Sequence, residues 1–503
     1  MAKVERIVFW SLVLDLFAFT IPLPLFPRII EWYTTREITD PNGFLSLTLN
    51  FVSAIRGILY KPSLHSKKWD IVLLGGLMGS VFSMLQFLVS PKIGSLSDKY
   101  GRKKILLITM IGNILSALVW VQSTTFASYM LSRVIGGLSE GNVQLAIAIL
   151  SDVSSPENRS KALAHVGIAF AICFCIGPPI GAYFASKPLS TASTFGYELN
   201  IYAVPAIITL VLLAVETVFL ILALPETRGK GIKTPQVDKT KTRGNPITQA
   251  SKTQSVEQKI ETLKSLRSIH LLFLGIFSGV EFTLTFLTFD CDCIYFLHVD
   301  PRLTPLFYTV FDWNNKQNGL LIGSIGIISA LLQGGYVRRA TAKVGEGSMA
   351  RRGVFSCVMG FIFLAIMPNY VSTNLKMAHR LLYLGATCLA FTSATVVNSL
   401  TAYASLQCDE GGFDPTTGKP AKVHPQLAKG KALGNFRSSG QLGRAVGPLI
   451  GLYKSSLPSF RQHLMRFLTA CASYWTFGPT YTYATSALAM FALSMHMRKI
   501  TRK

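Results

Sequence analysis

Eight ionisable side chains lie inside long apolar stretches of this 503-residue sequence. A charge in such a position is costly unless it has a partner or contacts water, and it therefore marks a candidate site. A carboxylate there can bind and release protons, whereas an arginine can bind an anion or neutralise an acid. The eight residues are Asp15, Arg133, Glu140, Glu216, Glu281, Arg380, Arg437 and Arg444.

Five of these residues form the candidate site. Asp15 and Arg444 fall near the middle of their apolar stretches. Arg133 and Glu140 are two helical turns apart and thus lie on one helix face. We expect these four residues and Glu281 to meet in one cavity, where the acids exchange protons and the arginines favour an anionic solute.

The other three residues have simpler explanations. For Glu216 and Arg437, the favoured interpretation is that acids and bases neutralise one another between helices. Arg380 lies so near the end of its stretch that its long side chain can reach water.

The apolar stretches themselves indicate a membrane protein. Hydrophobic residues make up 50% of the chain, 15% of the residues are charged and the mean hydropathy is +0.40. A bilayer core needs about 20 apolar residues per helix. The predicted fold class is therefore an all-α integral membrane fold with twelve transmembrane helices in two six-helix halves. The twelve spans are residues 7–26, 71–89, 105–121, 126–150, 162–185, 201–224, 269–289, 318–337, 353–368, 378–404, 431–453 and 471–495.

Basic residues predict the orientation of these helices. An even number of spans places both termini on one side, and that side carries more than twice as many Lys and Arg residues as the opposite loops. Such loops stay on the cytosolic side, so we expect cytosolic termini in a plasma membrane or an organelle membrane. A lipid bilayer, rather than a nucleic acid, then explains the net charge of +24. The first stretch lacks a small-residue cleavage site, so we interpret it as a retained helix rather than a signal peptide.

The segment 225–268 separates the two predicted halves, 1–224 and 269–503. It is basic, rich in Ser, Thr, Gln and Gly, and poor in apolar residues, which predicts a flexible cytosolic linker. Two long loops, 28–70 and 290–317, are predicted on the outer side. For both loops we favour variable decoration over a role in gating.

An internal repeat relates the two halves. At an offset of 270 residues, SKALAHVGIAFAICFCIGPPIGAY aligns without gaps to GKALGNFRSSGQLGRAVGPLIGLY, with eight of 24 positions identical. Such duplicated halves are typical of transporters, in which the solute site lies between them. The repeat places one helix-packing motif in the fifth span and one in the eleventh, formed by Gly177, Pro178 and Gly181 and by Gly447, Pro448 and Gly451.

A dense cluster of charge lies between two long apolar runs in GSLSDKYGRKK, residues 94–104, where five of eleven residues are charged. It connects the second and third predicted spans, and we interpret it as a cytosolic turn in which Gly94 and Gly101 permit tight bends. Arg102 and Lys103 hold this turn on the cytosolic side. That task needs no acid, so we expect Asp98 to pair with a helix N-terminus or with an arginine.

These motifs resemble those of the major facilitator superfamily, and the resemblance covers nearly the whole chain. GSLSDKYGRKK matches the family signature GxLxDxxGRR/K between the second and third helices, and RVIGG matches RxxxG in the fourth. GPPIG resembles the GPxxG motif of the drug/proton antiporter branch, and PETRGK resembles the end of the sixth helix. The resemblance implies a cytosolic gate formed by Gly94, Asp98, Gly101, Arg102 and Lys103. It implies that charge pairs of Asp98 and Arg102 break when the inner side opens.

The motifs and buried charges together predict a secondary active transporter that works by alternating access and is coupled to protons. We expect a small organic solute, either an amphipathic organic anion or a drug-like molecule. The alternative is a transporter-shaped accessory protein that binds a partner and moves no solute. The signature loop and the buried charges favour transport, because a scaffold has no need to keep both.

Other functions have little support in the sequence. It contains no phosphate-binding loop beside a nucleotide motif, and Cys291-Asp-Cys293 is too short for a zinc site. We therefore expect no enzymatic activity, no cofactor and no metal. The expected partners are the solute, protons and the lipid bilayer, without nucleic acid, and we expect the protein to be a monomer.

Overall fold

The computed structural model describes residues 3–22, 25–37, 40–59, 67–185, 202–228, 255–288, 315–371, 373–408, 424–450 and 479–500. All regular secondary structure in these ranges is helical. Eight helical stretches are long and apolar enough to cross a membrane by length and composition. The predicted all-α membrane fold is confirmed.

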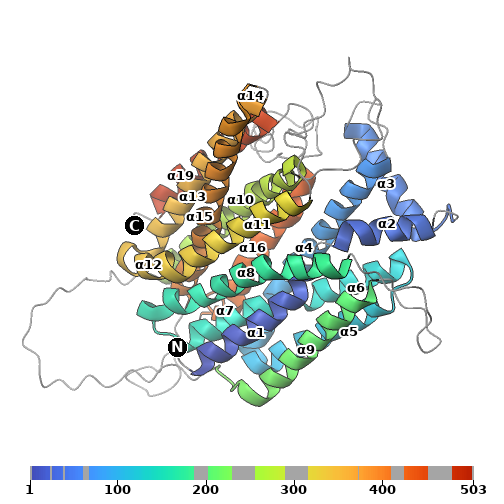
Figure 1. Ribbon diagram of the computed structural model, residues 1–503. Coiled ribbons are helices and arrows are strands. Elements are labelled where there is room, and N and C mark those ends of the chain that lie inside the picture. Colours follow the sequence, from blue (N-terminus) through green and yellow to red (C-terminus); the bar gives the residue numbers. More distant parts are fainter. Residues whose placement is uncertain are drawn as a thin grey trace, which may run out of the picture.

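The helices up to residue 223 form one group in space (Figure 1). Several are longer than a bilayer requires, because polar and basic residues extend them beyond their apolar parts. Their bounds are α1 (Lys3–Thr20), α2 (Phe26–Arg36), α3 (Phe44–Leu59), α4 (Lys67–Tyr100), α5 (Arg102–Val121), α6 (Phe126–Ser139), α7 (Asn142–Val153), α8 (Pro156–Ala185) and α9 (Ala203–Ala223).

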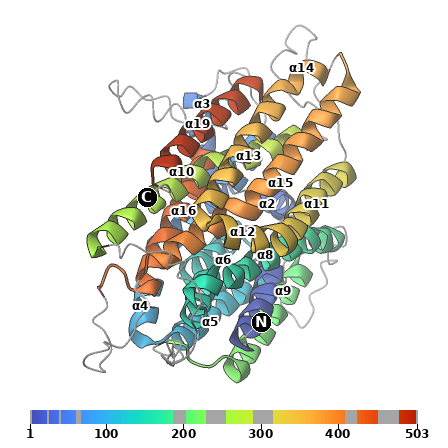
Figure 2. The same cartoon turned by 90° about the vertical axis from the view of Figure 1, so that its left-hand side faces the viewer.

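The remaining helices form a second group beside the first, and Figure 2 shows the same division from another side for the long helices, with α2 and α3 seen behind the second group. The groups meet where α4 packs along α16 and where α8 packs along α11. The bounds are α10 (Val256–Thr288), α11 (Asn315–Leu331), the π-helix η3 (Leu332–Val337), α12 (Arg338–Val344), α13 (Glu346–Ile366), α14 (Pro368–Val371), α15 (Leu375–Leu406), α16 (Lys429–Ile450) and α19 (Pro479–Ile500).

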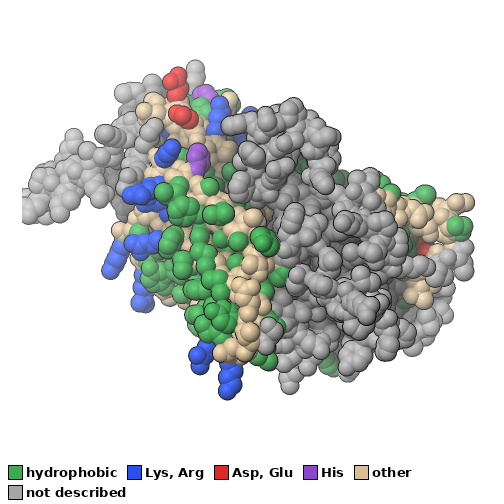
Figure 3. All heavy atoms as spheres, turned by 90° about the horizontal axis from the view of Figure 1, so that it is seen from above, with side chains coloured by type: hydrophobic (Ala, Val, Ile, Leu, Met, Phe, Trp, Pro, Cys, Tyr) green, Lys and Arg blue, Asp and Glu red, His purple; other side chains and the backbone are tan. Residues whose placement is uncertain are grey.

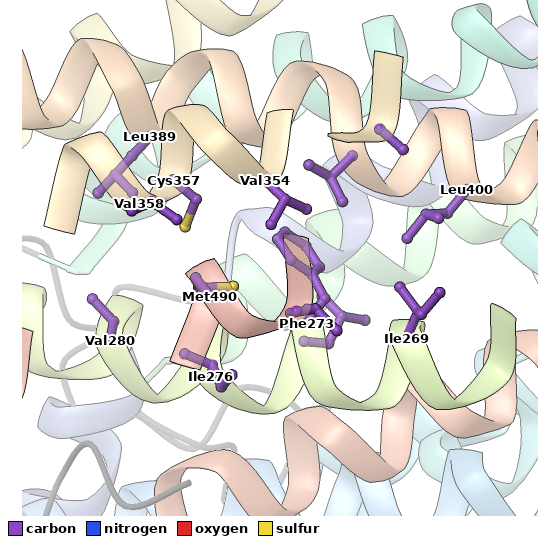
Figure 4. Close-up of a cluster of buried hydrophobic side chains, with 14 of the residues drawn as sticks. Ile269, Phe273, Ile276, Val280, Val354, Cys357, Val358, Leu389, Leu400 and Met490 are labelled. Carbon is purple, nitrogen blue, oxygen red and sulfur yellow. The ribbon is translucent and has the colours of Figure 1, made fainter. Parts of the chain in front are cut away.

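Most of each group's buried apolar side chains form one cluster, and each cluster also includes one alanine of the other group, Ala148 or Ala402. In the second group, side chains of α10, α13, α15 and α19 point toward one another, with Phe273 and Met490 near the centre (Figure 4). In the first group, α1, α5, α7, α8 and α9 supply a corresponding cluster. Helices packed in this way behave as units, whereas the contacts between the groups are more polar, as described below.

The start of α1 and the end of α19 lie on the same side of the molecule, here called the terminal side (Figure 1). On the face seen in Figure 3, Lys and Arg side chains gather toward this side, and hydrophobic side chains cover the surface next to them. Large apolar side chains are exposed on most of the long helices, for example Ile108, Leu222 and Leu331. Such a surface suits contact with lipid rather than water.

Three predictions about the elements need correction. The signature stretch is not a turn from Gly94 onward, because α4 continues to Tyr100 and only Gly101 breaks the helix. The predicted span 126–150 is found as one candidate membrane span, Phe126–Val153, but it is not one continuous helix, because it is interrupted at Glu140 and Gly141, where Glu140 adopts an extended conformation. The linker 225–268 is not flexible throughout, because α10 already begins at Val256.

The first predicted outer loop contains two helices, α2 and α3, which pack against α4. The hydroxyl of Tyr33 donates to the carbonyl oxygen of Ser123 at 2.8 Å, and the carboxylate of Glu37 accepts from the backbone N–H of Phe126 at 2.7 Å. These bonds tie α2 to the ends of α5 and α6. Of the second predicted loop, 290–317, only residues from Asn315 onward lie within the described part of the chain.

Candidate functional site

A polar junction joins the two helix groups on the terminal side, and Asp98 is at its centre. Asp98 lies in the last turns of α4 and accepts hydrogen bonds from the backbone N–H groups of Gly430 at 2.9 Å and Lys431 at 2.7 Å. These groups belong to the first turn of α16, where N–H groups lack partners within the helix. A carboxylate is favoured there by the helix dipole as well. The helix N-terminus predicted as the partner of Asp98 is thus that of α16.

Arg102 extends this junction within the first helix group. Its guanidinium forms ion pairs with Asp98 at 2.8 Å and with Asp152, near the end of α7, at 2.9 Å. Lys429 reaches the same Asp152 carboxylate from the second group at 3.6 Å and donates to the carbonyl oxygen of Ser151 at 3.0 Å. The basic and acidic side chains are largely buried, so water screens these interactions only weakly. We call Asp98, Arg102, Asp152 and Lys429 the latch.

Two further contacts between the groups lie beside the latch. Arg159 donates to the carbonyl oxygens of Ser151 and Ser154 in its own group, each at 3.1 Å, and to that of Ser405 on α15 at 3.4 Å. Ser160, at the start of α8, donates to the carboxylate of Glu346 at the start of α13. The terminal side is therefore closed by several polar contacts from different helices.

Glu226 holds the latch helix α5 in place from the segment after α9. Its carboxylate accepts from the backbone N–H groups of Arg102 at 2.8 Å and Lys103 at 3.1 Å, which are the first residues of α5. Partial burial disfavours the charged carboxylate and by itself would raise the pKa of Glu226. The hydrogen bonds from backbone N–H groups outweigh this effect of burial, so the pKa of Glu226 lies below its usual value. The foremost of these N–H groups belong to Arg228, Arg102 and Lys103. The PETRG stretch is thus a cap for α5.

Glycine has two different uses in the signature stretch. Gly101 has a φ of 106°, a left-handed conformation that side chains other than glycine rarely adopt, and it separates α4 from α5. Gly94 lies inside α4, and a Cβ atom there would collide with the carbonyl oxygen of Gly430. Gly94 therefore serves the close crossing of α4 and α16 and does not form a bend.

A second polar cluster lies deeper in the molecule, where α7 begins after the break at Glu140. Asp15 of α1 is buried, and the side-chain amide of Asn142 donates to its carboxylate at 2.6 Å. Glu140 hydrogen-bonds with Asn113 of α5. From the second helix group, Arg437 of α16 interacts electrostatically with both carboxylates. Two acids of one group thus face a base of the other.

The remaining predicted cavity residues are distributed differently. Arg444 is exposed on α16, two turns beyond Arg437, and the two cations interact. Arg133 lies nearer the opposite side, with its guanidinium 5.3 Å from the ring centroids of both Trp120 and Tyr129. Glu281 is in α10, but its side chain lies outside the described residues.

The two helix-packing motifs lie in α8 and α16. Pro178 is inside α8, and a Cβ atom on Gly177 would collide with Thr20 of α1. Gly181, in the same helix, is buried. In α16, Gly447 packs closely against Gly275 of α10. Pro448 lies in the last turn of α16, but its side chain is outside the described residues, and Gly451 lies beyond the described part of the helix.

Sequence patterns missed several residues of these clusters. Asn142 and Asn113 are neutral and short, so they scarcely alter the hydropathy of an apolar stretch. Asp152 and Lys429 lie at helix ends, where charges are ordinary and carry no signal of pairing. The one clue to Asn142 is its position two residues after Glu140 within an apolar stretch.

A duplicated bundle of membrane helices, closed on one side by a signature-stretch latch, defines a membrane transporter of the facilitator type. The sequence model for the Major Facilitator Superfamily matches residues 8–413. The chain belongs to this superfamily, whose members are transporters.

Individual relatives narrow the comparison. The chain is 30% identical over 461 residues to the human "Major facilitator superfamily domain-containing protein 10", covering 89% of this chain and 86% of that protein. The crystal structure of the human organic anion transporter MFSD10 (TETRAN) is similar with a TM-score of 0.71 and 27% identity, over 98% of this chain and 99% of that one. A shorter match, 33% identical over 106 residues, is to the class H tetracycline resistance protein of Pasteurella multocida, covering 21% of this chain and 26% of that protein.

Two sequence stretches point to the same relationship. LDLFAFTIPLPLFPR in the first span and KGKALGNFRSSGQLGRAVGPLIG in the eleventh are similar to the tetracycline transporter-like protein of animals. The prediction of such a relative is confirmed by the matches over most of the chain.

Proposed function

We propose that this protein is a secondary active transporter that moves small organic anions by alternating access and is driven by protons. The observation that carries the proposal is the latch, in which Lys429 pairs with Asp152 and the start of α16 donates hydrogen bonds to Asp98, so that polar contacts join the two helix groups there. Polar contacts can break when water enters and re-form when it leaves, so they suit an interface that opens in each cycle. Residues 1–224 and 269–503 are the proposed moving halves, joined by 225–268.

The distribution of basic residues indicates which side of the membrane the latch faces. The termini and the loops predicted on the same side contain most of the basic residues, and on the described surface Lys and Arg side chains gather toward the terminal side (Figure 3). We infer that this side is cytosolic, in keeping with the positive-inside rule. With this orientation, the contacts of the latch support a state that is closed toward the cytosol.

The substrate class rests on the charges of α16. Arg437 interacts with Asp15 and Glu140, and Arg444, two turns farther along the same helix, is exposed. An exposed guanidinium in the middle of a transport helix offers several fixed donors to a carboxylate or sulfonate. The human relative MFSD10 is described as an organic anion transporter, which agrees with this choice.

Proton coupling rests on the cluster of Asp15, Glu140 and Arg437. One cation faces two carboxylates there, so a proton on either acid changes how strongly the two halves attract one another. Glu281 lies in α10, which corresponds to the seventh predicted span, the second half's counterpart of the first span, and we propose that it takes or shares this role.

A transport assay tests the proposal. Purified protein in liposomes should take up radiolabelled p-aminohippurate, an aromatic carboxylate, faster when a pH gradient is imposed. Asp15→Asn and Glu281→Gln should retain exchange of p-aminohippurate across the membrane, and at least one of them should lose accumulation driven by the gradient. A matched control is Glu257→Gln, an exposed acid in the first turn of α10.

The same assay distinguishes the accessory-protein alternative. A scaffold without transport would show no uptake above empty liposomes for the parent protein, and its partner binding would be unaffected by Asp15→Asn. Uptake that is insensitive to pH in the parent would instead remove the proton from the proposal and leave facilitated diffusion.

A further inference from the structure

Another buried acid, Glu216, lies between α9 and α1 and has no part in the function proposed above. Its side chain is completely buried. The hydroxyl of Ser11 on α1 donates to Glu216 Oε1 at 2.6 Å. The second carboxyl oxygen, Oε2, has no hydrogen-bond partner among the described residues. The sequence alone suggested a neutralised structural acid, but the structure surrounds it differently.

The charged groups that act on Glu216 are acids. Asp15 lies one helical turn beyond Ser11 on the same helix, about 6 Å along its axis, and it interacts electrostatically with Glu216. Glu140 does so from the end of α6. An ionised Glu216 would thus have one hydrogen bond and two carboxylate neighbours, without an ion pair in the described part of the chain. A buried charge in such surroundings is very costly, and the neutral acid is the form that fits.

The described parts of the helices packed on α9 offer no nearby base to offset the charge. These helices are α1, α5 and α8. The basic residues of α5 are in its first turn, at 102–104, where Lys103 donates to the carbonyl oxygen of Ile221 beyond Glu216. Those of α1 are Lys3 and Arg6 in its first turns.

The helix α8 contributes two titratable groups in its buried part, and each has a backbone partner of its own. His165 bonds to the carbonyl oxygen of Ala162 and packs edge-on against Phe9. The thiol of Cys173 donates to the carbonyl oxygen of Val13. The basic residues of α8 precede His165, toward the terminal side, at Arg159 and Lys161.

Asp15 differs from Glu216 in a way that separates their roles. Asp15 accepts a hydrogen bond from Asn142 and faces Arg437 of the other half, so its ionised form has partners. Glu216 has Ser11 as its hydrogen-bond partner within the described ranges. A hydroxyl can donate to a carboxylate or accept from a carboxylic acid, so the same 2.6 Å contact serves both forms of Glu216.

We propose that Glu216 is a second proton-binding site, which holds a proton while the latch is closed and exchanges it with Asp15 past the Ser11 hydroxyl. The step moves one proton from the Asp15 carboxyl to the Glu216 carboxylate, leaving Asp15 ionised and paired with Arg437. Glu216 is seven residues from the end of α9, about 10 Å along the helix from the terminal side. The proton leaves Glu216 to water on that side when the latch opens. This inference rests on the proton-coupled transport proposed above.

The first experiment detects the proton without transport. Infrared difference spectra of the purified protein, recorded near neutral pH with and without Glu216→Gln, report the C=O stretch of protonated carboxylic acids. We expect Glu216→Gln to remove one such band and Ser11→Ala to shift it, because the acid loses the hydrogen bond from the Ser11 hydroxyl. Glu257→Gln is the matched control and should leave the band in place. A band that persists in Glu216→Gln, in a protein that elutes as the parent does, overturns the proposal.

The second experiment measures how far a pH gradient drives the transport of p-aminohippurate in liposomes. Glu216→Gln should keep exchange of the solute and lose at least tenfold in accumulation driven by a pH gradient, whereas Glu216→Asp should restore part of it. Full pH-driven accumulation in Glu216→Gln overturns the role of Glu216 even if the infrared band is lost. If the parent itself shows no pH-driven accumulation, the proton-coupled function fails, while the infrared result still decides whether Glu216 holds a proton. Should Glu216→Gln not fold, the shift in Ser11→Ala decides the same point.

Discussion

Neutralising Asp98 should open the latch, and the structure allows the size of the effect to be estimated. The carboxylate accepts two backbone hydrogen bonds from α16 and pairs with Arg102. Hydrogen bonds to charged groups contribute about 1.5 to 3 kcal/mol each, and the helix N-terminus adds about 0.3 to 1 kcal/mol. In Asp98→Asn one oxygen can still accept, so we expect the closed state to lose about 2 to 4 kcal/mol. At about 1.4 kcal/mol for each factor of ten, the ratio of closed to open molecules falls roughly 30- to 700-fold.

The separation of the two halves can be measured directly. Spin labels at Tyr100→Cys and Gln426→Cys, both exposed and near the latch, report the distance between α4 and the segment before α16. In a background that lacks reactive cysteines and still transports, the parent should give one short distance. Asp98→Asn should add a longer population and reduce uptake.

A control and a refuting result complete this test. Lys104→Gln removes an exposed charge two residues beyond Arg102 and should leave the distances unchanged. If Asp98→Asn shows the distances and the uptake of the parent, the contacts of Asp98 do not hold the terminal side closed.

Three further predictions concern packing, a helix cap and a buried cation. Gly94→Val should collide with the facing backbone of α16 and abolish uptake, whereas Gly79→Val in the same helix, where a Cβ atom meets nothing within 4 Å, should be tolerated when both are assayed in liposomes. Because the pKa of Glu226 is lowered, its stabilising effect is present above the ordinary carboxyl pKa and is lost as the pH falls through its own lower value. Thermal unfolding between about pH 7 and pH 3 should therefore show a smaller acid-induced loss of stability in Glu226→Gln than in the parent, and an unchanged loss in the control Glu257→Gln. Arg133→Gln removes two cation–π contacts, so its free energy of unfolding in detergent should fall by about 1 to 3 kcal/mol; a value equal to that of the parent would show that these contacts do not stabilise the fold.

Two kinds of residue could be predicted from the sequence: charged residues that are costly to place in an apolar stretch, and residues that belong to a recognisable motif. Asp15 and Arg437 were recognisable because a charge within an apolar stretch needs a reason. Gly101 was predicted to permit a tight bend, and it is the residue that separates α4 from α5. The partners of Asp98 were predicted by type, as a helix N-terminus or an arginine, and both are present. The identity of that helix was not predictable, because Gly430 lies far along the chain from Asp98.

At other positions the sequence was compatible with more than one local structure, and each case has a physical reason. Gly94 is compatible with a bend or with a close helix crossing, and only the position of α16 distinguishes the two. The break at Glu140 and Gly141 was hidden by continuous hydropathy on both sides. Residues 256–268 are polar, which is typical of a linker but also of a helix that extends beyond the bilayer.

The sequence by itself determined that this chain is an all-α membrane protein of duplicated halves, because hydropathy, basic loops and repeats act through composition and order along one chain. Only the tertiary structure decided which charges meet. Asp98 with the start of α16, Asp15 with Asn142 and Arg437, and Glu216 with Ser11 are pairings between helices distant in sequence. The energy of a charge depends on the groups a few ångströms away, and the packing of helices, not their order, sets those distances.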